Sequence, residues 1–480
     1  MVSIRKSLNG TTIFLTGATG YFGRALLYRL LRDLRPLKIY LLVRGSSKQS
    51  ARERWESEIL SDPMWKRVLP EKTREDLLSK LTLVEGDVSR PDLGIATEKF
   101  EQLAGDLDLI INSAACISFE PPLDEALNLN INGPLHLLAL AKAANCPFLQ
   151  VSTAFVCGNQ DGVILEETPS KPPAWIHDRI QGLKQIVEDA ERAYPDPSQR
   201  KARSEHMKGS GNALANKNGW PNAYTYSKFL AEQQLMLHRG GVPLILFRPA
   251  IISSAHAFPY PGWIESIRGM DLLLVAFGDG QLSYFPAKKE IPLDLVPVDL
   301  AANACIASLA KGMTEDTSVF QFGTSLSNPL IFRRFADLTW QHYSASPKLD
   351  ATGDPIRMKP LVMPDYEQSQ RRIQRLSKFR SLLSLGLKPL AGVMRIGVYR
   401  RRLGAKNRLD SRNLTYMKMY SNFTTTRREF STAAMDAVYK TLPAEEQSTF
   451  NFDYRELEWD SYVRDIHVPG LRKCEKGLYE

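Results

Sequence analysis

The sequence predicts an α/β protein with a doubly wound parallel sheet, followed by a mostly helical C-terminal part. A glycine-rich turn lies between a short apolar run and an amphipathic helix, and strand and helix patterns then alternate over the first 150 residues. The strand pattern stops near residue 350. We therefore expect two domains, residues 1–349 and residues 350–480.

The first strand, at residues 12–16, runs into the turn Gly17-Ala18-Thr19-Gly20-Tyr21-Phe22-Gly23, and an amphipathic helix follows. Residues without a Cβ let the backbone approach a pyrophosphate, and the N-terminus of the next helix directs free N–H groups at that anion. The order strand, turn, helix and second strand is the context that this motif requires. We expect nucleotide contacts from Gly17, Thr19, Gly20, Tyr21 and Gly23.

The second strand, at residues 38–43, ends at Arg44, and Lys48 and Arg52 follow closely. An acidic residue at this strand end accepts from a ribose 2′-OH and favours NAD(H), whereas a basic residue pairs with a 2′-phosphate and favours NADP(H). Arg44 therefore predicts NADPH as the cofactor. The alternative is that these basic side chains only solvate the start of a helix.

Two further strands are expected to add cofactor contacts at their carboxyl ends. The third, residues 81–88, carries Asp87, which can accept from the adenine amino group, with the Val88 backbone beside it. The fourth, residues 107–111, is followed by small residues that include Ala114, and these let a cofactor lie against the backbone.

A helical pattern at residues 123–144 carries Asn130, whose side chain can bind a neighbouring carbonyl or a water and stabilise a distorted turn. A capping or solvated Asn is the alternative. The fifth strand, residues 148–153, ends in Ser152-Thr153. Because ligands lie at the carboxyl ends of such strands, this strand end belongs to the expected active-site layer.

Polar, irregular sequence at residues 158–222 predicts a substrate-side insertion with a helix over residues 176–193. The sixth strand follows at residues 244–251, and its exit adds Pro249 and Ile251 to the expected cofactor contacts. We expect a second substrate-side insertion at about residues 252–300.

The candidate catalytic residues are Thr153, Tyr224 and Lys228. Tyr224 and Lys228 are four apart in a helical pattern, hence on one helix face, and an ammonium there favours the phenolate and lowers the tyrosine pKa. Hydride attack on a carbonyl builds negative charge on oxygen, to which the Thr153 and Tyr224 hydroxyls can donate. Tyr224 would also donate the proton, and Lys228 would hold the nicotinamide ribose. Tyr226 lacks such a partner, since Leu230 stands four residues on.

The glycine spacing resembles the extended short-chain dehydrogenase/reductases, which are built on a Rossmann sheet. Nearly the whole chain, and its tail most specifically, resembles the fatty acyl-CoA reductases, the bacterial alcohol-forming members most closely. The stretches that carry this resemblance are residues 14–23, 41–44, 112–119, 151–156, 261–264, 291–299 and the tail 450–471. One departure is Pro297 before Val298-Asp299, where a single Ile-Pro-Val-Asp run displaced by a few residues is expected.

The resemblance implies NADPH-dependent reduction of a long-chain fatty acyl-CoA thioester to an aldehyde and then to a primary alcohol, with release of CoA. Thr153, Tyr224 and Lys228 match the family's catalytic positions, and residues 350–480 correspond to its C-terminal domain. Two related enzymes remain as alternatives: an aldehyde-forming acyl-CoA reductase, and a thioester reductase acting on carrier-protein-bound chains. A nucleotide-sugar epimerase or dehydratase is disfavoured by Arg44, and a non-enzymatic NADP sensor by the intact catalytic set.

The net charge of +9 is local, because residues 371–408 hold twelve Lys or Arg and no acidic residue. Subtracting twelve from +9 leaves −3 for the rest of the chain, which argues against a nucleic-acid-binding protein. A basic segment with apolar residues can lie on a membrane surface, contact CoA phosphates, or be a helical hairpin with a solvated face. Peripheral membrane contact through residues 371–408 is our hypothesis.

Five cysteines form no CxxC pair and no zinc spacing, which fits buried thiols in a reducing compartment. The histidines show no metal-ligand spacing, so we expect no metal. No signal peptide and no membrane-spanning run is expected. The sequence thus favours a cytoplasmic enzyme, with oligomeric state left open.

Overall fold

The computed structural model describes residues 2–168, 171–282, 284–313, 316–387 and 394–477. The chain forms two compact units. The sheet unit comprises Met1–Trp263, Asp294–Asn328 and Glu429–Leu457, and the helical unit comprises Ile264–Leu293, Pro329–Arg428 and Glu458–Glu480. The boundary expected near residue 350 remains a prediction from the sequence pattern, whereas the compact units divide the chain at other places.

The sheet unit contains a seven-stranded parallel sheet with the order β11-β7-β5-β4-β1-β2-β3. Its strands are β1 (Thr12–Thr16), β2 (Lys38–Val43), β3 (Leu81–Glu85), β4 (Leu109–Asn112), β5 (Phe148–Val151), β7 (Leu244–Pro249) and β11 (Thr317–Phe322). The strand order reverses between β1 and β4, where such sheets bind ligands at the carboxyl ends of the strands. The predicted doubly wound Rossmann sheet is confirmed, and β11 is a strand that the sequence analysis missed.

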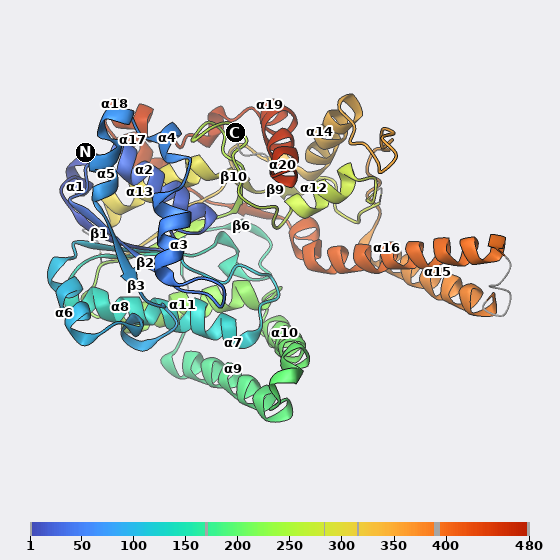
Figure 1. Cartoon of the computed structure of the whole chain (residues 1–480), viewed down its shortest axis with the longest axis horizontal. Coiled ribbons are helices and arrows are strands. Elements are labelled where there is room, and N and C mark those ends of the chain that lie inside the picture. The colour runs from blue at the N-terminus through green and yellow to red at the C-terminus, as the bar shows by residue number, and fades with distance from the viewer. Residues whose placement is uncertain (1, 169–170, 283, 314–315, 388–393, 478–480) are drawn as a thin grey trace. The chain divides into compact units, whose positions relative to one another are not determined.

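Helices cover both faces of this sheet, as Figure 1 shows for the sheet unit. On one face, α6 (Thr97–Asp106), α8 (Gly133–Ala144) and α11 (Ala223–His238) pack on an apolar core. On the other, α2 (Tyr21–Asp33) lies beside α13 (Val298–Gly312). The near-continuous apolar strands follow from this double coverage, because neither face of the sheet meets water.

The predicted insertion forms a pair of helices, α9 (Pro173–Ala193) and α10 (Arg200–Lys217). They share an apolar cluster with α11 and with the helical stretch at residues 123–132. The insertion is thereby packed against the helix that carries Tyr224 and Lys228.

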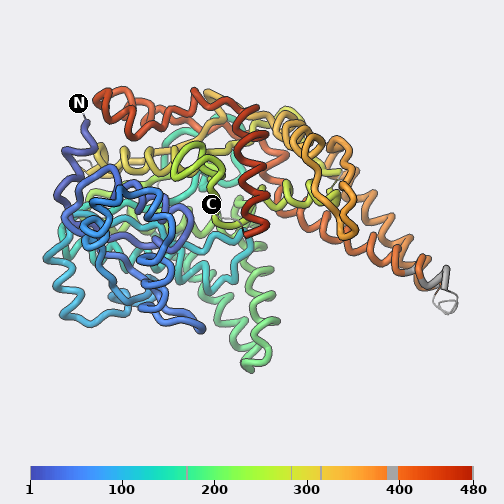
Figure 2. The backbone as a smooth tube through the Cα atoms, turned by 45° about the horizontal axis from the view of Figure 1, so that its top comes forward, coloured from blue at the N-terminus to red at the C-terminus, as the bar shows by residue number. Residues whose placement is uncertain are grey.

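Residues 429–457 belong to the sheet unit, although they lie far along the chain. They include α17 (Ala433–Thr441) and α18 (Ala444–Thr449). The Glu446 carboxylate accepts from Ser3 Oγ and Ile4 N, both at 2.7 Å, at the start of α1 (Ile4–Leu8). Figure 2 shows this late segment running beside the N-terminal end of the chain.

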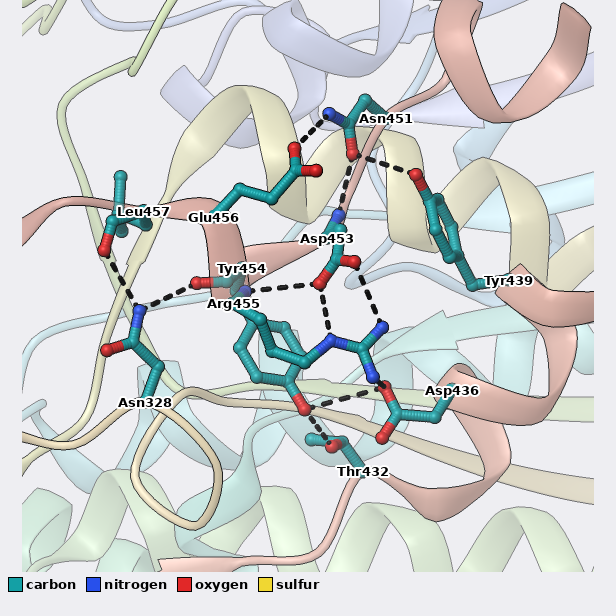
Figure 3. Close-up of polar contacts among 10 residues, drawn as sticks. All are labelled: Asn328, Thr432, Asp436, Tyr439, Asn451, Asp453, Tyr454, Arg455, Glu456 and Leu457. Carbon is teal, nitrogen blue, oxygen red and sulfur yellow. Dashed lines mark hydrogen bonds and ion pairs between the residues drawn. The ribbon is translucent and has the colours of Figure 1, made fainter. Parts of the chain in front are cut away.

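A polar network joins the end of this segment to the rest of the sheet unit (Figure 3). Asn328 Nδ2 donates to the carbonyls of Tyr454 and Leu457, both at 2.9 Å. The Tyr454 hydroxyl lies 2.6 Å from Thr432 Oγ1. These bonds hold residues 454–457 against Asn328 and Thr432.

The helical unit contains α12 (Asp271–Gly278), α14 (Phe332–Ala345), α15 (Tyr366–Gly386), α16 (Met394–Thr425), α19 (Trp459–Ser461) and α20 (Val468–Glu475). Its two short strands, β9 (Pro292–Leu293) and β12 (Leu330–Ile331), pair antiparallel. Lys348 Nζ ties α12 to α20 through Asp279 Oδ1 at 2.9 Å and Glu475 Oε1 at 2.6 Å. Within the described part of the chain, no helix is long and apolar enough to cross a membrane.

Shorter elements complete the chain. They are α3 (Ala51–Arg54), η1 (Trp55–Leu60), α4 (Trp65–Val68), η2 (Glu71–Thr73), α5 (Arg74–Ser79), η3 (Pro91–Gly94), α7 (Leu123–Glu125), η4 (Ala126–Asn132), η5 (Ala154–Cys157), β6 (Gly162–Ile164), η6 (Pro197–Gln199), β8 (Ile251–Ser253), β10 (Leu295–Pro297), β13 (Arg428–Phe430), η7 (Tyr454–Glu456) and η8 (Tyr462–His467).

Candidate active site

The glycine turn between β1 and α2 lies against the backbone that follows β4. Gly17 has φ +75°, and a Cβ there would stand 2.6 Å from Ser113 C and 2.7 Å from Ala114 N. A Cβ on Gly23 would stand 2.2 Å from Gly17 O. Both glycines are therefore required by close backbone approach, and the predicted contacts Gly17 and Ala114 are brought together.

Tyr21 begins α2, and Gly20 is its N-cap. The Tyr21 hydroxyl donates to the carbonyls of Ser253 at 3.0 Å and Trp263 at 2.9 Å. This side chain is thus engaged within the protein, so a phosphate at the turn would meet the backbone at the N-terminus of α2 rather than the Tyr21 hydroxyl. Thr19 lies in the turn just before α2.

Arg44 and Asp87 stand side by side at the ends of β2 and β3. Arg44 Nη1 lies 3.6 Å from Asp87 Oδ2, and the Arg44 side chain is 54% exposed. Arg54 Nη1 donates to the Arg44 carbonyl at 2.7 Å and so fixes the backbone there. The Val88 carbonyl is bound by His136 Nδ1 at 2.8 Å. The structure therefore places the expected phosphate-binding cation beside the expected adenine acceptor.

A ladder of buried polar side chains crosses the carboxyl ends of β1, β4 and β5. Thr16 Oγ1 donates to Asn112 Oδ1 at 2.5 Å, and Asn112 Nδ2 donates to Gln150 Oε1 at 2.8 Å. Asn112 Oδ1 also accepts from Ala114 N at 3.1 Å. Sequence reasoning missed this ladder, although a polar residue near the end of each of three apolar strands was a visible signal.

The ladder ends at Lys228. Gln150 Nε2 and Lys228 Nζ both donate to the Val151 carbonyl, each at 2.7 Å. Thr153 follows two residues later, where its Oγ1 caps the short helix η5 by accepting from Phe155 N. The structure thus brings Lys228 to the strand end that carries Thr153.

Burial shifts the pKa values of both candidate residues on α11. Burial lowers the pKa of Lys228 to about 8, although the nearby Glu232 carboxylate acts in the opposite direction and raises this pKa. Burial, and then Cys116, raises the pKa of the Tyr224 phenol. In the protein alone the phenol is therefore a protonated donor at neutral pH. Tyr226 is different, because its ring lies 5.0 Å from that of Trp220 in the apolar cluster.

Asn130 lies in the π-helical stretch η4, so the expected distortion of this helix is confirmed. Its Nδ2 donates to the Cys116 carbonyl and to Ser227 Oγ, both at 3.0 Å, and its Oδ1 accepts from Cys116 N at 2.8 Å. Ser227 Oγ in turn donates to the Tyr224 carbonyl at 2.8 Å. Asn130 therefore ties the loop after β4 to the first turn of α11.

Pro249 ends β7 and Ile251 begins β8, at the same edge of the sheet unit. Ile251 N donates to the Asp294 carbonyl at 3.0 Å. The Asp294 carboxylate, whose pKa burial raises, accepts from Thr324 N at 2.6 Å and from the Ser325 hydroxyl.

The second carboxylate of the 291–299 motif fixes a loop. Asp299 accepts from the backbone N–H groups of His256, Ala257 and Phe258 at 2.8, 2.8 and 2.9 Å. Pro297 precedes it as the last residue of β10. Both aspartates of this motif therefore act as anchors for neighbouring backbone, a role that the sequence pattern did not reveal.

Cysteines and metal ligands add no further centre to this site. All five cysteines are free, with Cys146 and Cys305 buried. Among the described residues, no cluster of His, Cys, Asp or Glu could hold a metal ion.

Comparison with known proteins places the chain in a family. Two family models match it, both described as male sterility protein, over residues 15–305 and residues 393–474. Fatty acyl-CoA reductase 2, chloroplastic, of Arabidopsis thaliana is 30% identical over 98% of this chain and 79% of its own length. The alcohol-forming fatty acyl-CoA reductase of Simmondsia chinensis is 27% identical over 98% of both chains.

Two solved reductase domains are similar to this chain in fold. The terminal R domain from the myxalamid PKS-NRPS biosynthetic pathway has a TM-score of 0.60 at 18% identity, over 100% of this chain and 95% of that one. The reductase (R) domain of a non-ribosomal peptide synthetase from Mycobacterium tuberculosis has a TM-score of 0.55 at 19% identity, over 99% and 95%.

The parallel sheet, the glycine turn and the first family model define an oxidoreductase with an NAD(P)-binding Rossmann sheet of the short-chain dehydrogenase/reductase type. Within that class, the chain belongs to the fatty acyl-CoA reductase family. The resemblance to the fatty acyl-CoA reductases is thereby confirmed, whereas the closer likeness to bacterial alcohol-forming members stays a prediction.

Proposed function

We propose that this protein reduces a long-chain fatty acyl-CoA to the primary alcohol through the aldehyde, using NADPH and releasing CoA. Membership of the fatty acyl-CoA reductase family supports the acyl substrate. The observation that carries the chemistry is the Lys228 ammonium, held 2.7 Å from Val151 O beside Thr153 and one helical turn from Tyr224.

The residues present fit a nicotinamide cofactor. Gly17 and Gly23 permit the tight turn between β1 and α2, because a Cβ at either position would meet backbone, and the N-terminus of α2 suits a pyrophosphate. Arg44 would bind the 2′-phosphate, with its charge partly balanced by Asp87, which supports NADPH. When bound, the cofactor supplies hydride. The remaining proposed contacts are Thr19, Gly20, Tyr21, Val88, Ala114, Lys228, Pro249 and Ile251.

The protein's own groups would stabilise the oxygen that becomes negative. Hydride addition to the thioester carbonyl gives a thiohemiacetal oxyanion, to which the Thr153 and Tyr224 hydroxyls donate. Its collapse breaks the C–S bond and releases CoA thiolate and aldehyde. A second hydride addition gives an alkoxide, which takes its proton from Tyr224 to form the alcohol. Lys228 would stabilise the phenolate that remains. Each of the two reduction steps consumes one hydride.

The first test is NADPH oxidation with palmitoyl-CoA, with thiol release and the lipid products measured together. We expect two NADPH per CoA and hexadecanol. Tyr224→Phe should lower kcat by about 100-fold or more, because the proton donor is lost. Tyr226→Phe is the matched control and should stay near wild type, since Tyr226 lies in the apolar cluster beside Trp220.

Two other results would redirect the proposal. One NADPH per CoA with free aldehyde would make the enzyme aldehyde-forming. Turnover of an acyl carrier protein thioester, with none of the acyl-CoA, would make it a carrier-dependent thioester reductase, and equal rates in Tyr224→Phe and wild type would remove Tyr224 from the mechanism.

We further propose that this enzyme is cytoplasmic and contacts an anionic membrane surface through the hairpin of α15 and α16, which Figure 1 draws side by side. On α15, Phe379, Leu382 and Leu385 are 64%, 68% and 66% exposed. Arg380 pairs with Asp410, and Asn407 Nδ2 donates to Ser381 Oγ at 3.0 Å, so the helices run antiparallel.

This pairing brings the exposed Arg401 and Arg402 of α16 towards the C-terminal end of α15. Apolar side chains beside cations fit the acyl boundary and the headgroups of an anionic lipid surface. A long-chain alcohol partitions into lipid, so such contact would ease its release.

Vesicle sedimentation tests this membrane contact. Wild type should bind vesicles of phosphatidylcholine with phosphatidylserine and bind pure phosphatidylcholine less. Joint substitution of Phe379, Leu382 and Leu385 by Ser, or of Arg401 and Arg402 by Glu, should reduce binding about tenfold, because apolar burial or charge attraction is lost. Leu37→Ser is the matched control, since Leu37 is 67% exposed in the sheet unit. Equal binding by all variants would refute the contact.

A further inference from the structure

Helix α11 carries three titratable side chains one turn apart: Tyr224, Lys228 and Glu232. Spacing of four residues puts them along one face of the helix. Lys228 is 3% exposed and Glu232 is 0% exposed. A carboxylate buried this deeply needs a partner, because the loss of its hydration is costly.

That partner is Arg248 on β7. Arg248 Nε donates to Glu232 Oε1 at 2.9 Å, and Nη2 donates to Glu232 Oε2. The guanidinium is also held from its other side, by the Glu167 carbonyl at 2.9 Å and by the Thr168 hydroxyl. The ion pair is therefore fixed in place by β7 and by the segment that precedes the α9 insertion.

We propose that the Glu232–Arg248 pair is a positioning unit for Lys228, in which the Glu232 carboxylate keeps the Lys228 ammonium charged beneath Tyr224. This inference rests on the proposed catalytic role of Tyr224 and Lys228. A buried ion pair by itself contributes little net stability, so its placement one turn from the catalytic lysine is the feature that asks for an explanation.

Of the charged groups near Lys228, Glu232 is the carboxylate that favours the charged form of its ammonium group. Tyr224 and Glu232 face it from α11, and Arg248 reaches Glu232 from β7. The Cys116 thiol, from the loop after β4, acts on Tyr224 and lies 3.7 Å from Glu125 Oε2. Strand β5 offers only the neutral Val151 carbonyl, and the pKa of Lys228 would fall further without Glu232.

The sign of the effect follows from this arrangement. The reaction needs two protons in place, one on the Tyr224 phenol and one on the Lys228 ammonium. Removal of the Glu232 charge lowers the pKa of Lys228, and the positive charge of Arg248 then acts unopposed. The Lys228 proton is therefore lost at lower pH, and activity falls earlier on the alkaline side.

The test is the pH profile of kcat/KM for wild type and Glu232→Gln. We expect the alkaline limb of Glu232→Gln to move about one pH unit lower. The double variant Glu232→Gln/Arg248→Met, which leaves no unpaired charge, should lie between the two. Thr168→Val is the control: it removes an Arg248 contact without changing charge, so its Tm should fall while its limb stays in place.

An unmoved limb in both the single and the double variant would overturn the proposal and leave the pair as structural. If the single variant does not fold, the double variant decides.

A readout independent of activity separates this inference from the proposed function. The pKa of Lys228 is lower in the folded protein than in the unfolded chain, so deprotonation of Lys228 stabilises the folded state. Wild type should thus gain Tm relative to Lys228→Met as pH rises above about 8. In the Glu232→Gln background this gain should begin at lower pH, even if acyl-CoA is not the substrate. An unchanged onset would refute the role of Glu232.

Discussion

Arg44 is the side chain on which the proposed use of NADPH depends. Its side chain is half exposed, and its guanidinium lies 3.6 Å from Asp87. The ion pair therefore orients the guanidinium and leaves part of it accessible to a further anion. A 2′-phosphate would add a stronger, doubly charged partner to the same guanidinium. The residue thus joins the adenine side and the phosphate side of the expected cofactor site.

Substitution of this side chain tests the choice of NADPH. Arg44→Ala should raise KM for NADPH about tenfold or more, because the phosphate partner is lost, and should leave KM for NADH nearly unchanged. Initial-rate kinetics with both cofactors measure the difference. Arg52→Ala is the matched control, since Arg52 pairs with Glu56 at 3.0 Å within its own helix. An equal change for both cofactors would contradict a role in phosphate recognition.

At the scale of elements, the β1–α2 turn determines whether the nucleotide end of the sheet can form. Gly17 adopts a left-handed conformation against the Ser113–Ala114 backbone, and Gly23 meets the Gly17 carbonyl. Strand, turn and helix are thus packed without space for a single methyl group. The polar ladder from Thr16 to Lys228 extends this fixed geometry across three strands.

Gly17→Ala should lower the free energy of unfolding by about 1–3 kcal/mol, because alanine is strained at φ +75° and its Cβ meets backbone. The same variant should lose NADPH binding measured by nucleotide fluorescence. Gly105→Ala on α6 is the control, as nothing lies within 4 Å of its Cβ position. It should retain wild-type stability or exceed it. Wild-type stability and NADPH affinity in Gly17→Ala would show that the turn can relax.

At the scale of the whole molecule, the sheet unit is assembled from three separate stretches of chain. Its last stretch, residues 429–457, forms hydrogen bonds with groups of the first stretch. Glu446 accepts from the start of α1, and Glu166 Oε2 accepts from Ala434 N at 2.7 Å. The part of the chain that looks like a C-terminal appendage in the sequence therefore supplies part of the nucleotide-binding unit.

Two truncations test this assembly. A chain ending after residue 457 keeps all three stretches and should retain NADPH binding and a cooperative thermal transition. A chain ending after residue 428 loses the partners of α1 and of Glu166, so we expect it to lose both. Calorimetry and nucleotide fluorescence compare the two chains. A chain ending after residue 428 that still bound NADPH would contradict the role of residues 429–457.

The sequence alone determined the fold class, the family, six of the seven sheet strands and the candidate residues of the site. These features are local: apolar strands, glycine spacing and a four-residue helical repeat can be read within a few positions of one another. The strand at residues 38–43 was placed within its observed bounds for this reason. The helix at residues 123–144 was also placed correctly, and Asn130 marked its π-helical stretch.

Only the tertiary structure decided which distant groups meet. Strand β11, the Arg44–Asp87 pair, the Glu232–Arg248 pair and the return of residues 429–457 all join positions that the chain separates. These contacts are stabilised by burial and by hydrogen bonds whose partners lie on other elements. The local sequence pattern around one residue does not identify such a distant partner. The sequence could therefore name Lys228 as a catalytic candidate, whereas its anchor on Val151 and its neighbouring charge pair required the fold.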